Sequence, residues 1–322
     1  MLEKITYPVE KELNAFSKLY TAALNSRITH FQFMLDFISK KKGKRIRPLI
    51  LILSAKLCGE PTHQTLEYAV VLELLHTATL IHDDVVDNTR ERRGQPSVMS
   101  EYDNRAAVLL GDYILAQAIE LGVKTENLTA LKIMANLAQN MSDGELSQLI
   151  AASELIVDEK RYLDVIRKKT AVLLSSCSEM GALSVNADAE TTKILHAIGE
   201  NLGMCFQIRD DIFDYFEQGD LGKPTGNDIR EGKITLPLIY ALQTAPKEHA
   251  DAVLNIIRSR DFSPENVQQI IRFTKAHHGI EYAQAKMQTI KNETISLLNR
   301  FPDSDTKSAM MLLIDYIIGR EK

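Results

Sequence analysis

The stretch Leu80-Ile81-His82-Asp83-Asp84-Val85-Val86-Asp87 sets three carboxylates directly behind an apolar run. In a helix, Asp83 and Asp87 lie one turn apart on one face, and Asp84 lies about 100° round the axis from them. Such carboxylates repel one another unless cations bind them. Oxygen ligands of this kind suit a hard divalent metal, and Mg²⁺ usually bridges one or two carboxylates to substrate phosphates. The stretch therefore predicts a helix that carries a magnesium site.

The same carboxylate spacing returns downstream in Gln207-Ile208-Arg209-Asp210-Asp211-Ile212-Phe213-Asp214-Tyr215, again in an apolar setting. A single acidic cluster of this kind is more often a solvated helix end followed by a loop. Two such clusters are costly to place in apolar surroundings, and they are more simply explained as facing walls of one metal-filled cavity.

The composition is that of a globular protein, with 45% hydrophobic and 25% charged residues among 322. No Gly/Ser-rich linker or low-complexity tract divides the chain, so we expect a single domain over residues 1–322. The net charge of -5 argues against a general nucleic-acid binder, since such proteins carry a clear basic excess. The sequence opens on no apolar leader and holds no stretch approaching the roughly 18 apolar residues of a membrane span, which predicts a cytoplasmic protein without stable membrane insertion.

Hydrophobic periodicity predicts helices along most of the chain. Between residues 66 and 82, Leu72, Leu75 and Thr79 fall on one helical stripe that runs to the carboxylates. No proline occurs between residues 97 and 223, and the hairpin signals Asn-Gly and Gly-Gly are absent. Other predicted helices cover residues 105–121, 128–152, 160–184, 190–217 and 233–243. These patterns predict an all-α fold.

Residues 40–47 carry six basic side chains around Gly43 and lead into Pro48. Such a run is often a solvated face, a localisation signal or an RNA-binding patch. Gly43 permits close backbone approach, and Pro48 suits the first turn of an apolar helix over residues 49–57. We favour a diphosphate cradle, because the acidic motifs demand an anionic ligand.

Two further features gain meaning from this context. His76 lies seven residues before Asp83 on the same predicted helix, and we favour a site role for it over the more common core role. Residues 221–237, directly beyond the second acidic motif, hold three glycines, two prolines and two lysines, which suits a lid that closes over phosphate.

With these motifs in order, the chain resembles the trans-polyprenyl diphosphate synthases over nearly its whole length, and most of all the long-chain octaprenyl and heptaprenyl synthases. The matching stretches are residues 43–48, 75–94, 169–170, 206–214 and 221–236. The resemblance implies a single-domain, all-α isoprenoid-synthase bundle around a central cavity, working as a homodimer. It implies a prenyltransferase that condenses isopentenyl diphosphate head-to-tail with an allylic prenyl diphosphate.

The resemblance also implies roles for individual residues. Asp83, Asp87 and Asp210 match ligands of about three Mg²⁺ ions per active site, and Asp84, Asp211 and Asp214 support them directly or through water. The isopentenyl diphosphate pocket is matched by Lys44, Arg47, His76 and Arg93. The allylic pocket is matched by Arg92 and by the implied catalytic residues Lys169, Thr170, Gln207, Lys223 and Lys233. The chain departs from the family pattern at Lys42, where a glycine is usual, and at Phe213, where leucine is common.

Product length depends on the helix that precedes the first motif. In short-chain relatives, an aromatic residue four or five positions before the first aspartate blocks the tunnel that receives the growing tail. Here those positions are Thr79 and Ala78, with Leu75 behind them, and Ala78 lies about 7.5 Å along the helix from Asp83. By resemblance we expect a long product of about C35 to C50, such as octaprenyl diphosphate for a quinone side chain.

Several alternatives remain open. They are a shorter-chain farnesyl or geranylgeranyl diphosphate synthase, and the catalytic subunit of a heteromeric hexaprenyl or heptaprenyl synthase that needs a small partner subunit. A terpene cyclase is less expected, because the second metal motif of cyclases is rich in Asn, Ser and Glu, whereas here it repeats the first. A non-catalytic partner subunit predicts eroded acidic motifs, and both motifs are intact.

Overall fold

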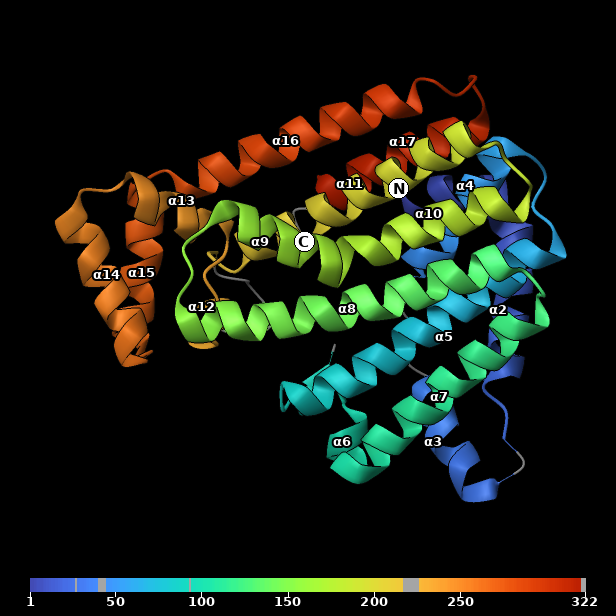
Figure 1. The fold of residues 1–322 in the computed structure, drawn as a ribbon, viewed down its shortest axis with the longest axis horizontal. Helices are drawn as coiled ribbons and strands as arrows, with labels where there is room; N and C mark the ends of the chain where they lie inside the picture. The colour runs from blue at the N-terminus through green and yellow to red at the C-terminus, as the bar shows by residue number, and fades with distance from the viewer. Residues whose placement is uncertain (27, 40–44, 93, 217–225, 320–322) are drawn as a thin grey trace. The chain divides into compact units, whose positions relative to one another are not determined.

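The chain is helical almost throughout the residues that the computed structural model describes, which are 1–26, 28–39, 45–92, 94–216 and 226–319 (Figure 1). It divides into two compact units. The first comprises residues 1–138, 176–196 and 301–312, and the second comprises residues 139–175, 197–300 and 313–322. The predicted all-α class is confirmed, whereas the single domain over residues 1–322 stays a prediction.

The first unit is built from the N-terminal helices and a short ladder. Its helices are α1 (Leu2–Thr6), the 3₁₀ turn η1 (Tyr7–Val9), α2 (Glu10–Ala23), α3 (Thr29–Ser39), α4 (Ile46–Cys58), α5 (His63–Val86), α6 (Val98–Glu101) and α7 (Asn104–Lys124). Four helices contribute residues to both units, namely α8 (Leu128–Glu154), α10 (Val172–Ser184), α11 (Ala189–Phe213) and α17 (Asp305–Ile318).

Helix α5, which carries the first acidic motif, packs against α2, α4, α6 and α7. It begins at a capping box, in which the Thr62 hydroxyl accepts the Thr65 N–H and the Thr65 hydroxyl accepts the Thr62 N–H. Buried apolar side chains lie on most of its faces, as expected of a core helix. At its end the Asp87 N–H donates to the Asp83 carbonyl at 2.8 Å. This helical bond places the two residues one turn apart, as predicted.

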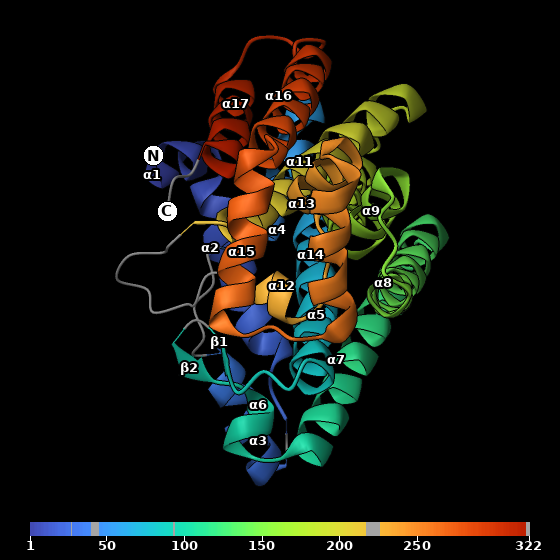
Figure 2. The same cartoon turned by 90° about the vertical axis from the view of Figure 1, so that its left-hand side faces the viewer.

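A short antiparallel ladder follows α5, between β1 (Glu91–Arg92) and β2 (Gln95–Pro96), and both strands are labelled in Figure 2. The register pairs Glu91 with Pro96 and Arg92 with Gln95. The sequence does not predict this ladder, because its turn contains neither Asn-Gly nor Gly-Gly. Gly94 supplies the positive φ, 73°, that the turn requires.

Helix α7 has a buried apolar face and several exposed apolar residues on its other face. Its buried stripe contains Ala107, Leu110, Gly111, Ile114, Ala118 and Gly122. An exposed apolar stripe contains Leu109, Ala116, Ile119 and Val123, with Leu109 65% exposed, and the exposed carboxylates of Asp112 and Glu120 lie beside it. By length and composition alone α7 could cross a membrane, which corrects the expectation that no stretch approaches a membrane span. One such helix is weak evidence for a span, because the test uses length and composition only and core helices of other proteins also pass it.

The second unit contains the remaining helices. They are α9 (Glu159–Ile166), the π-helical turn η2 (Arg167–Ala171), α12 (Asn227–Arg230), α13 (Leu236–Thr244), α14 (Lys247–Ser259), α15 (Pro264–Ala276) and α16 (Gly279–Leu298). Helices α14 and α15 pack side by side (Figure 1), and α13 packs against both α15 and α16. Their shared core includes Val253, Val267, Ile270 and Ile280.

Three predicted helices have wrong bounds, and the segment predicted as 233–243 begins only at Leu236 as α13. The segment 160–184 is not one α-helix, because η2 interrupts it between α9 and α10. Helix α11 ends at Phe213 rather than at residue 217. The Asp214 carboxylate, just beyond that end, accepts the N–H groups of Asn227 at 2.8 Å and Asp228 at 3.0 Å. These bonds cap α12 and hold Asp214 in a turn instead of a helix.

Candidate active site

A pocket of about 130 Å³ lies within the second unit, among α8, α9, η2, α11 and the segment before α13. Its polar lining consists of Gln148, Asp158, Arg161, Tyr162, Lys169, Thr170, Gln207, Asp211, Asp228, Lys233 and Thr235. The sequence assigns five of these to the site, namely Lys169, Thr170, Gln207, Asp211 and Lys233. The pocket therefore contains every predicted catalytic residue that the structure describes. It also contains one acidic residue of the second motif, Asp211.

The π-helical turn η2 carries Lys169 and Thr170 to this pocket. The Val172 N–H bonds to the carbonyl five residues earlier, at Arg167, which widens the helix by one residue. Glycines of α8 and α11 pack against the turn. A Cβ at Gly144 would lie 2.8 Å from the backbone nitrogen of Lys169, and a Cβ at Gly203 would overlap the Ala171 Cα. Neighbouring helices without side chains at these two positions thus leave room for the widened turn.

A series of hydrogen bonds runs from η2 to α9 along the pocket wall. The Thr170 hydroxyl donates to Gln207 Oε1 at 2.8 Å, and Gln207 Nε2 donates to Asp211 Oδ1 at 2.8 Å. The Tyr162 hydroxyl donates to the other carboxylate oxygen, Oδ2, at 2.5 Å. Gln207 and Asp211 lie one turn apart on α11, so the helix itself sets their spacing.

The groups in this series are strongly desolvated. Burial raises the pKa of Asp211 well above its usual range, and the neighbouring charge of Asp228 raises it further, while hydrogen bonds from Tyr162 and Gln207 oppose the rise. Burial and the adjacent Asp211 charge likewise raise the pKa of Tyr162. A diphosphate or cation that entered this pocket would meet fixed protein dipoles instead of bulk water.

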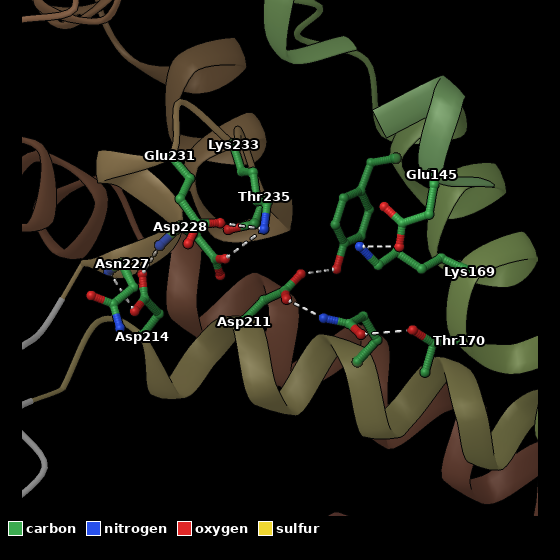
Figure 3. Close-up of polar contacts among 12 residues, drawn as sticks. Glu145, Lys169, Thr170, Asp211, Asp214, Asn227, Asp228, Glu231, Lys233 and Thr235 are labelled. Atoms are coloured by element: carbon green, nitrogen blue, oxygen red, sulfur yellow. Dashed lines mark hydrogen bonds and ion pairs between the residues drawn. The ribbon is translucent and has the colours of Figure 1, made fainter. Parts of the chain in front are cut away.

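Asp228 lies across the pocket from the π-turn, and Figure 3 shows Asp211 between it and Thr170. Burial raises the pKa of Asp228 to about 6, and the nearby Asp214 and Glu231 charges add to the rise, against the opposing charges of Lys233 and Lys169. Burial also raises the pKa of Asp214, although backbone N–H groups that it accepts limit the shift.

Asp228 should make stability depend on pH. Because its folded-state pKa, about 6, lies above the ordinary value of 3.8, the folded protein holds this proton more tightly. Its stabilising contribution is therefore complete below about pH 4 and is lost as the pH rises through about 6. With the side chain 27% exposed, we expect a loss on the order of 2 kcal/mol in the free energy of unfolding.

Denaturant unfolding of metal-free wild type and Asp228→Asn between pH 4 and pH 7 measures this loss. The difference in unfolding free energy between the two proteins should shift in favour of the variant as the pH rises. The Asp251→Asn protein, altered at an exposed aspartate of α14, serves as the control. A difference that stays constant over this range would show that Asp228 titrates normally.

The two lysines of the pocket already have carboxylate partners. Lys169 Nζ lies 2.5 Å from Glu145 Oε1 of α8. Lys233 pairs with Glu231 and lies 3.9 Å from Asp228 Oδ1 (Figure 3). The carboxylates hold these lysines at the pocket, and a bound diphosphate would replace them as a partner.

Asp210, the first carboxylate of the second motif, is 43% exposed at its side chain. Its Oδ1 accepts from the buried Arg209 guanidinium at 2.7 Å. Arg209 also donates to the carbonyl of Ile317 near the end of α17. Its guanidinium lies 4.9 Å from the Phe206 ring centroid and 5.6 Å from that of Phe213. Phe213, where the family often has leucine, thus helps to hold the arginine beside Asp210.

In the first unit, the first acidic motif is also joined to a basic residue. Arg92 of β1 donates through Nε to Asp84 Oδ1 at 2.7 Å, and its Nη2 lies 2.7 Å from the same oxygen. Asp84 is buried, whereas Asp87 is exposed at the end of α5. The predicted residues of the isopentenyl diphosphate pocket, Arg47 of α4 and His76 of α5, belong to this unit as well, and His76 is buried.

The three candidate chain-length residues lie on α5, ahead of the motif. Leu75 and Ala78 are buried, with Ala78 only 1% exposed. Thr79 is partly buried, and its hydroxyl donates to the His76 carbonyl at 2.9 Å. The residue that would meet a growing tail at the predicted depth is therefore small and enclosed.

Some predicted features cannot be placed. Lys44, Arg93 and Lys223 lie outside the described residues, as do Lys42 and Gly43. The two acidic motifs belong to different units, so their facing positions stay a prediction. Within the described ranges, no three His, Cys, Asp or Glu side chains gather as ligands of a metal ion would. The metal ligands also stay a prediction.

Sequence reasoning missed Tyr162, Glu145 and Asp228. Asp228 lies in the glycine-rich segment 221–237, whose position beyond the second motif was a usable signal. Tyr162 and Glu145 carry no such signal, because each is one polar residue within an ordinary helical pattern. Their partners, Asp211 and Lys169, are distant in sequence and meet them only in the fold.

A family model described as polyprenyl synthetase matches residues 29–274. The chain belongs to the polyprenyl synthetase family. The octaprenyl diphosphate synthase of Haemophilus influenzae is 31% identical to it over 99% of this chain and 97% of that protein. Heptaprenyl diphosphate synthase component 2 of Bacillus subtilis is 33% identical over 87% of this chain and 79% of that protein.

Solved structures of the family have the same fold. The polyprenyl synthase of Caulobacter crescentus, complexed with calcium and isoprenyl diphosphate, is 30% identical with a TM-score of 0.91, covering 100% of this chain and 98% of that one. The geranylgeranyl pyrophosphate synthase of Bacteroides thetaiotaomicron is 38% identical with a TM-score of 0.85, covering 99% of both chains. The predicted family, fold and prenyltransferase class are confirmed, and the octaprenyl and heptaprenyl relatives support the predicted long-chain trans-polyprenyl synthase.

Proposed function

We propose that this polyprenyl synthetase makes long all-trans polyprenyl diphosphates, of about C35 to C50, by Mg²⁺-dependent addition of isopentenyl diphosphate to an allylic diphosphate. One observation carries the proposal. Two lysines for a diphosphate, Lys169 and Lys233, and two side-chain oxygens for a cation, on Thr170 and Gln207, line a single pocket beside the second acidic motif.

The pocket suits the chemistry of such a condensation. Ionisation of the allylic substrate breaks a C–O bond and leaves a diphosphate anion and an allylic cation. Lys169 and Lys233 bind the departing diphosphate, while Thr170 and Gln207 direct oxygen dipoles toward the cation. The double bond of isopentenyl diphosphate attacks the cation, and a proton then leaves to the released diphosphate. No protein nucleophile is needed, and exclusion of water protects the cation.

The acidic residues fit a divalent metal. Asp83 and Asp87 lie one turn apart where α5 ends, and Asp210 has an accessible carboxylate, so we assign these three as ligands of about three Mg²⁺ ions. Asp84, Asp211 and Asp214 already bond to protein groups and support the ligands directly or through water. The calcium and isoprenyl diphosphate in the Caulobacter crescentus protein support this assignment. Mg²⁺, when bound, supplies charge neutralisation to the diphosphate leaving group.

The remaining assignments follow the family match. We assign the isopentenyl diphosphate pocket to Arg47 and His76, together with Lys44 and Arg93, which lie outside the described residues. Arg92 and Lys223 complete the allylic pocket. Arg92, paired with Asp84 in the present structure, can also bind a phosphate through the free edge of its planar guanidinium.

Small residues on α5 support a long product, since Ala78 and Thr79 stand where short-chain relatives carry an aromatic residue. The geranylgeranyl synthase of Bacteroides thetaiotaomicron, at 38% identity, favours a shorter product as the alternative. Product length is therefore the property that a direct assay must decide.

We also propose a homodimer that uses the exposed apolar stripe of α7. Leu109, Ile119 and Val123 are each at least half exposed on this face, and exposed apolar residues of this size favour a covering surface. The name of the Bacillus subtilis relative, a component 2, keeps a small partner subunit as the alternative. The charged substrates favour a cytoplasmic location, and the absence of a linker in the sequence favours a single polyprenyl synthase domain over residues 1–322.

Purified protein, incubated with Mg²⁺, farnesyl diphosphate and labelled isopentenyl diphosphate, tests the proposal. We expect a ladder of prenyl diphosphates that ends at one long length and disappears when the metal is chelated. Termination at about C20 would favour the short-chain alternative. Cyclic hydrocarbons in place of a ladder would identify a terpene cyclase, and no incorporation by the dimer would point to a missing subunit.

A further inference from the structure

We propose that Tyr162 is a positioning residue for the condensation, because its hydroxyl sets the direction in which the Thr170 oxygen faces the pocket. The inference rests on the proposed function for its chemical meaning. Its structural basis is the hydrogen-bond series from Tyr162 through Asp211 and Gln207 to Thr170, in which every donor and acceptor can be assigned.

The assignment begins at the tyrosine. Its hydroxyl occupies Asp211 Oδ2, which leaves Oδ1 to accept from the amide nitrogen of Gln207. The amide then turns its Oε1 toward η2, so the Thr170 hydroxyl must donate to it. Thr170 has one proton, and this bond uses it. The oxygen therefore presents lone pairs, not a proton, to the pocket.

This direction matters for a cation. An oxygen that presents lone pairs stabilises developing positive charge, whereas a hydroxyl turned the other way would oppose it. Without the Tyr162 hydroxyl, Asp211 Oδ2 loses its donor, so the carboxylate can turn Oδ1 away from Gln207 and the Gln207 amide can flip. The series would then lose its fixed orientation although Thr170 and Gln207 are both still present.

Both ends of the series are held in place. Tyr162 is buried on α9, and its bond to Asp211 is short, at 2.5 Å. Thr170 belongs to the π-turn. Helices α8 and α11 approach this turn closely, because Gly144 and Gly203 have no side chains there. Because neither end can move freely, the intervening side chains have one arrangement to adopt, which is the condition for preorganised electrostatic stabilisation.

The Tyr162→Phe protein removes the hydroxyl and keeps the ring. We expect kcat to fall about tenfold, with the KM of the allylic substrate changed by less than about twofold. Tyr282→Phe is the matched control, because Tyr282 also donates to a carboxylate of this unit, at Glu159 Oε2 and 2.7 Å, but does not line the pocket. The control should keep kcat. An unchanged kcat in Tyr162→Phe would overturn the proposal.

A double-mutant cycle with Thr170→Val separates positioning from packing. If Tyr162 acts through the Thr170 oxygen, adding Tyr162→Phe to Thr170→Val should cause little further loss of kcat. Fully additive losses would overturn the proposal, since they would mean that the two residues act independently. Thermal unfolding of all variants shows whether a loss of activity follows a loss of fold.

A binding measurement does not depend on turnover. Calorimetric titration with geranyldimethylammonium, a cation of allylic shape, in the presence of Mg²⁺ and inorganic pyrophosphate reports on the oxygen that faces the cation. We expect affinity about tenfold weaker in Tyr162→Phe and unchanged in Tyr282→Phe. Equal affinity in wild type and Tyr162→Phe would overturn the inference, whether or not the wild type extends prenyl diphosphates. If the affinities are equal but the wild type still makes a ladder of prenyl diphosphates, the proposed function stands and only the role of Tyr162 is wrong.

Discussion

The Asp83→Asn protein is expected to lose about 10³-fold in kcat while keeping its fold. The substitution preserves the size of the side chain and removes the charge that a hard cation requires. It leaves the helical bond from the Asp87 N–H to the Asp83 carbonyl untouched, because that bond is between backbone groups. Steady-state assays with farnesyl diphosphate and labelled isopentenyl diphosphate at saturating Mg²⁺ measure the loss.

Stability should change in the opposite direction. Asp83 and Asp87 are like charges one turn apart, so removing one relieves a repulsion of about 0.2–0.5 kcal/mol in metal-free protein. Denaturant unfolding without metal should therefore show a small gain, and the stabilisation that Mg²⁺ with pyrophosphate gives to the wild type should be reduced. Asp251→Asn, at an exposed site on α14, should change neither property. Near-normal kcat in Asp83→Asn would show that the first motif does not hold a catalytic metal.

The fold class was predictable because the strongest patterns are local. The stripe through Leu72, Leu75 and Thr79 belongs to one core helix, and α5 extends it to the first motif as expected. The π-turn was not predictable, since it depends on Gly144 and Gly203, which approach it from other helices. The early end of α11 likewise depends on bonds that Asp214 makes with a distant segment.

The site shows the same division between local and distant causes. Lys169, Thr170 and Gln207 could be chosen from motifs, and the fold places them in one pocket. Tyr162 could not be chosen, because its importance comes from a partner on another helix. Sequence motifs thus identified residues expected to contact the substrate, whereas the residues that orient them emerged only from packing and hydrogen bonds.

The Ala78→Tyr protein is expected to make products of about C15 to C20 in place of about C35 to C50. Ala78 is buried on α5, about 7.5 Å along the helix from Asp83, and a tyrosine there would fill the space that the proposed function assigns to the growing tail. The first condensations should proceed normally, because the substitution lies beyond the diphosphate-binding end. Chromatography of the labelled products after dephosphorylation measures their length.

Smaller side chains at residue 78, and a tyrosine at the neighbouring residue 79, distinguish a blocked tunnel from a damaged core. Ala78→Ser adds one oxygen and should leave product length unchanged, whereas Ala78→Leu should give an intermediate length. Thr79→Tyr, one residue nearer the motif and partly buried, should shorten the product at a smaller risk of overpacking. If Ala78→Tyr remains folded and still makes the wild-type length, the tail does not run along this face of α5. The residue that ends elongation must then be sought on another helix.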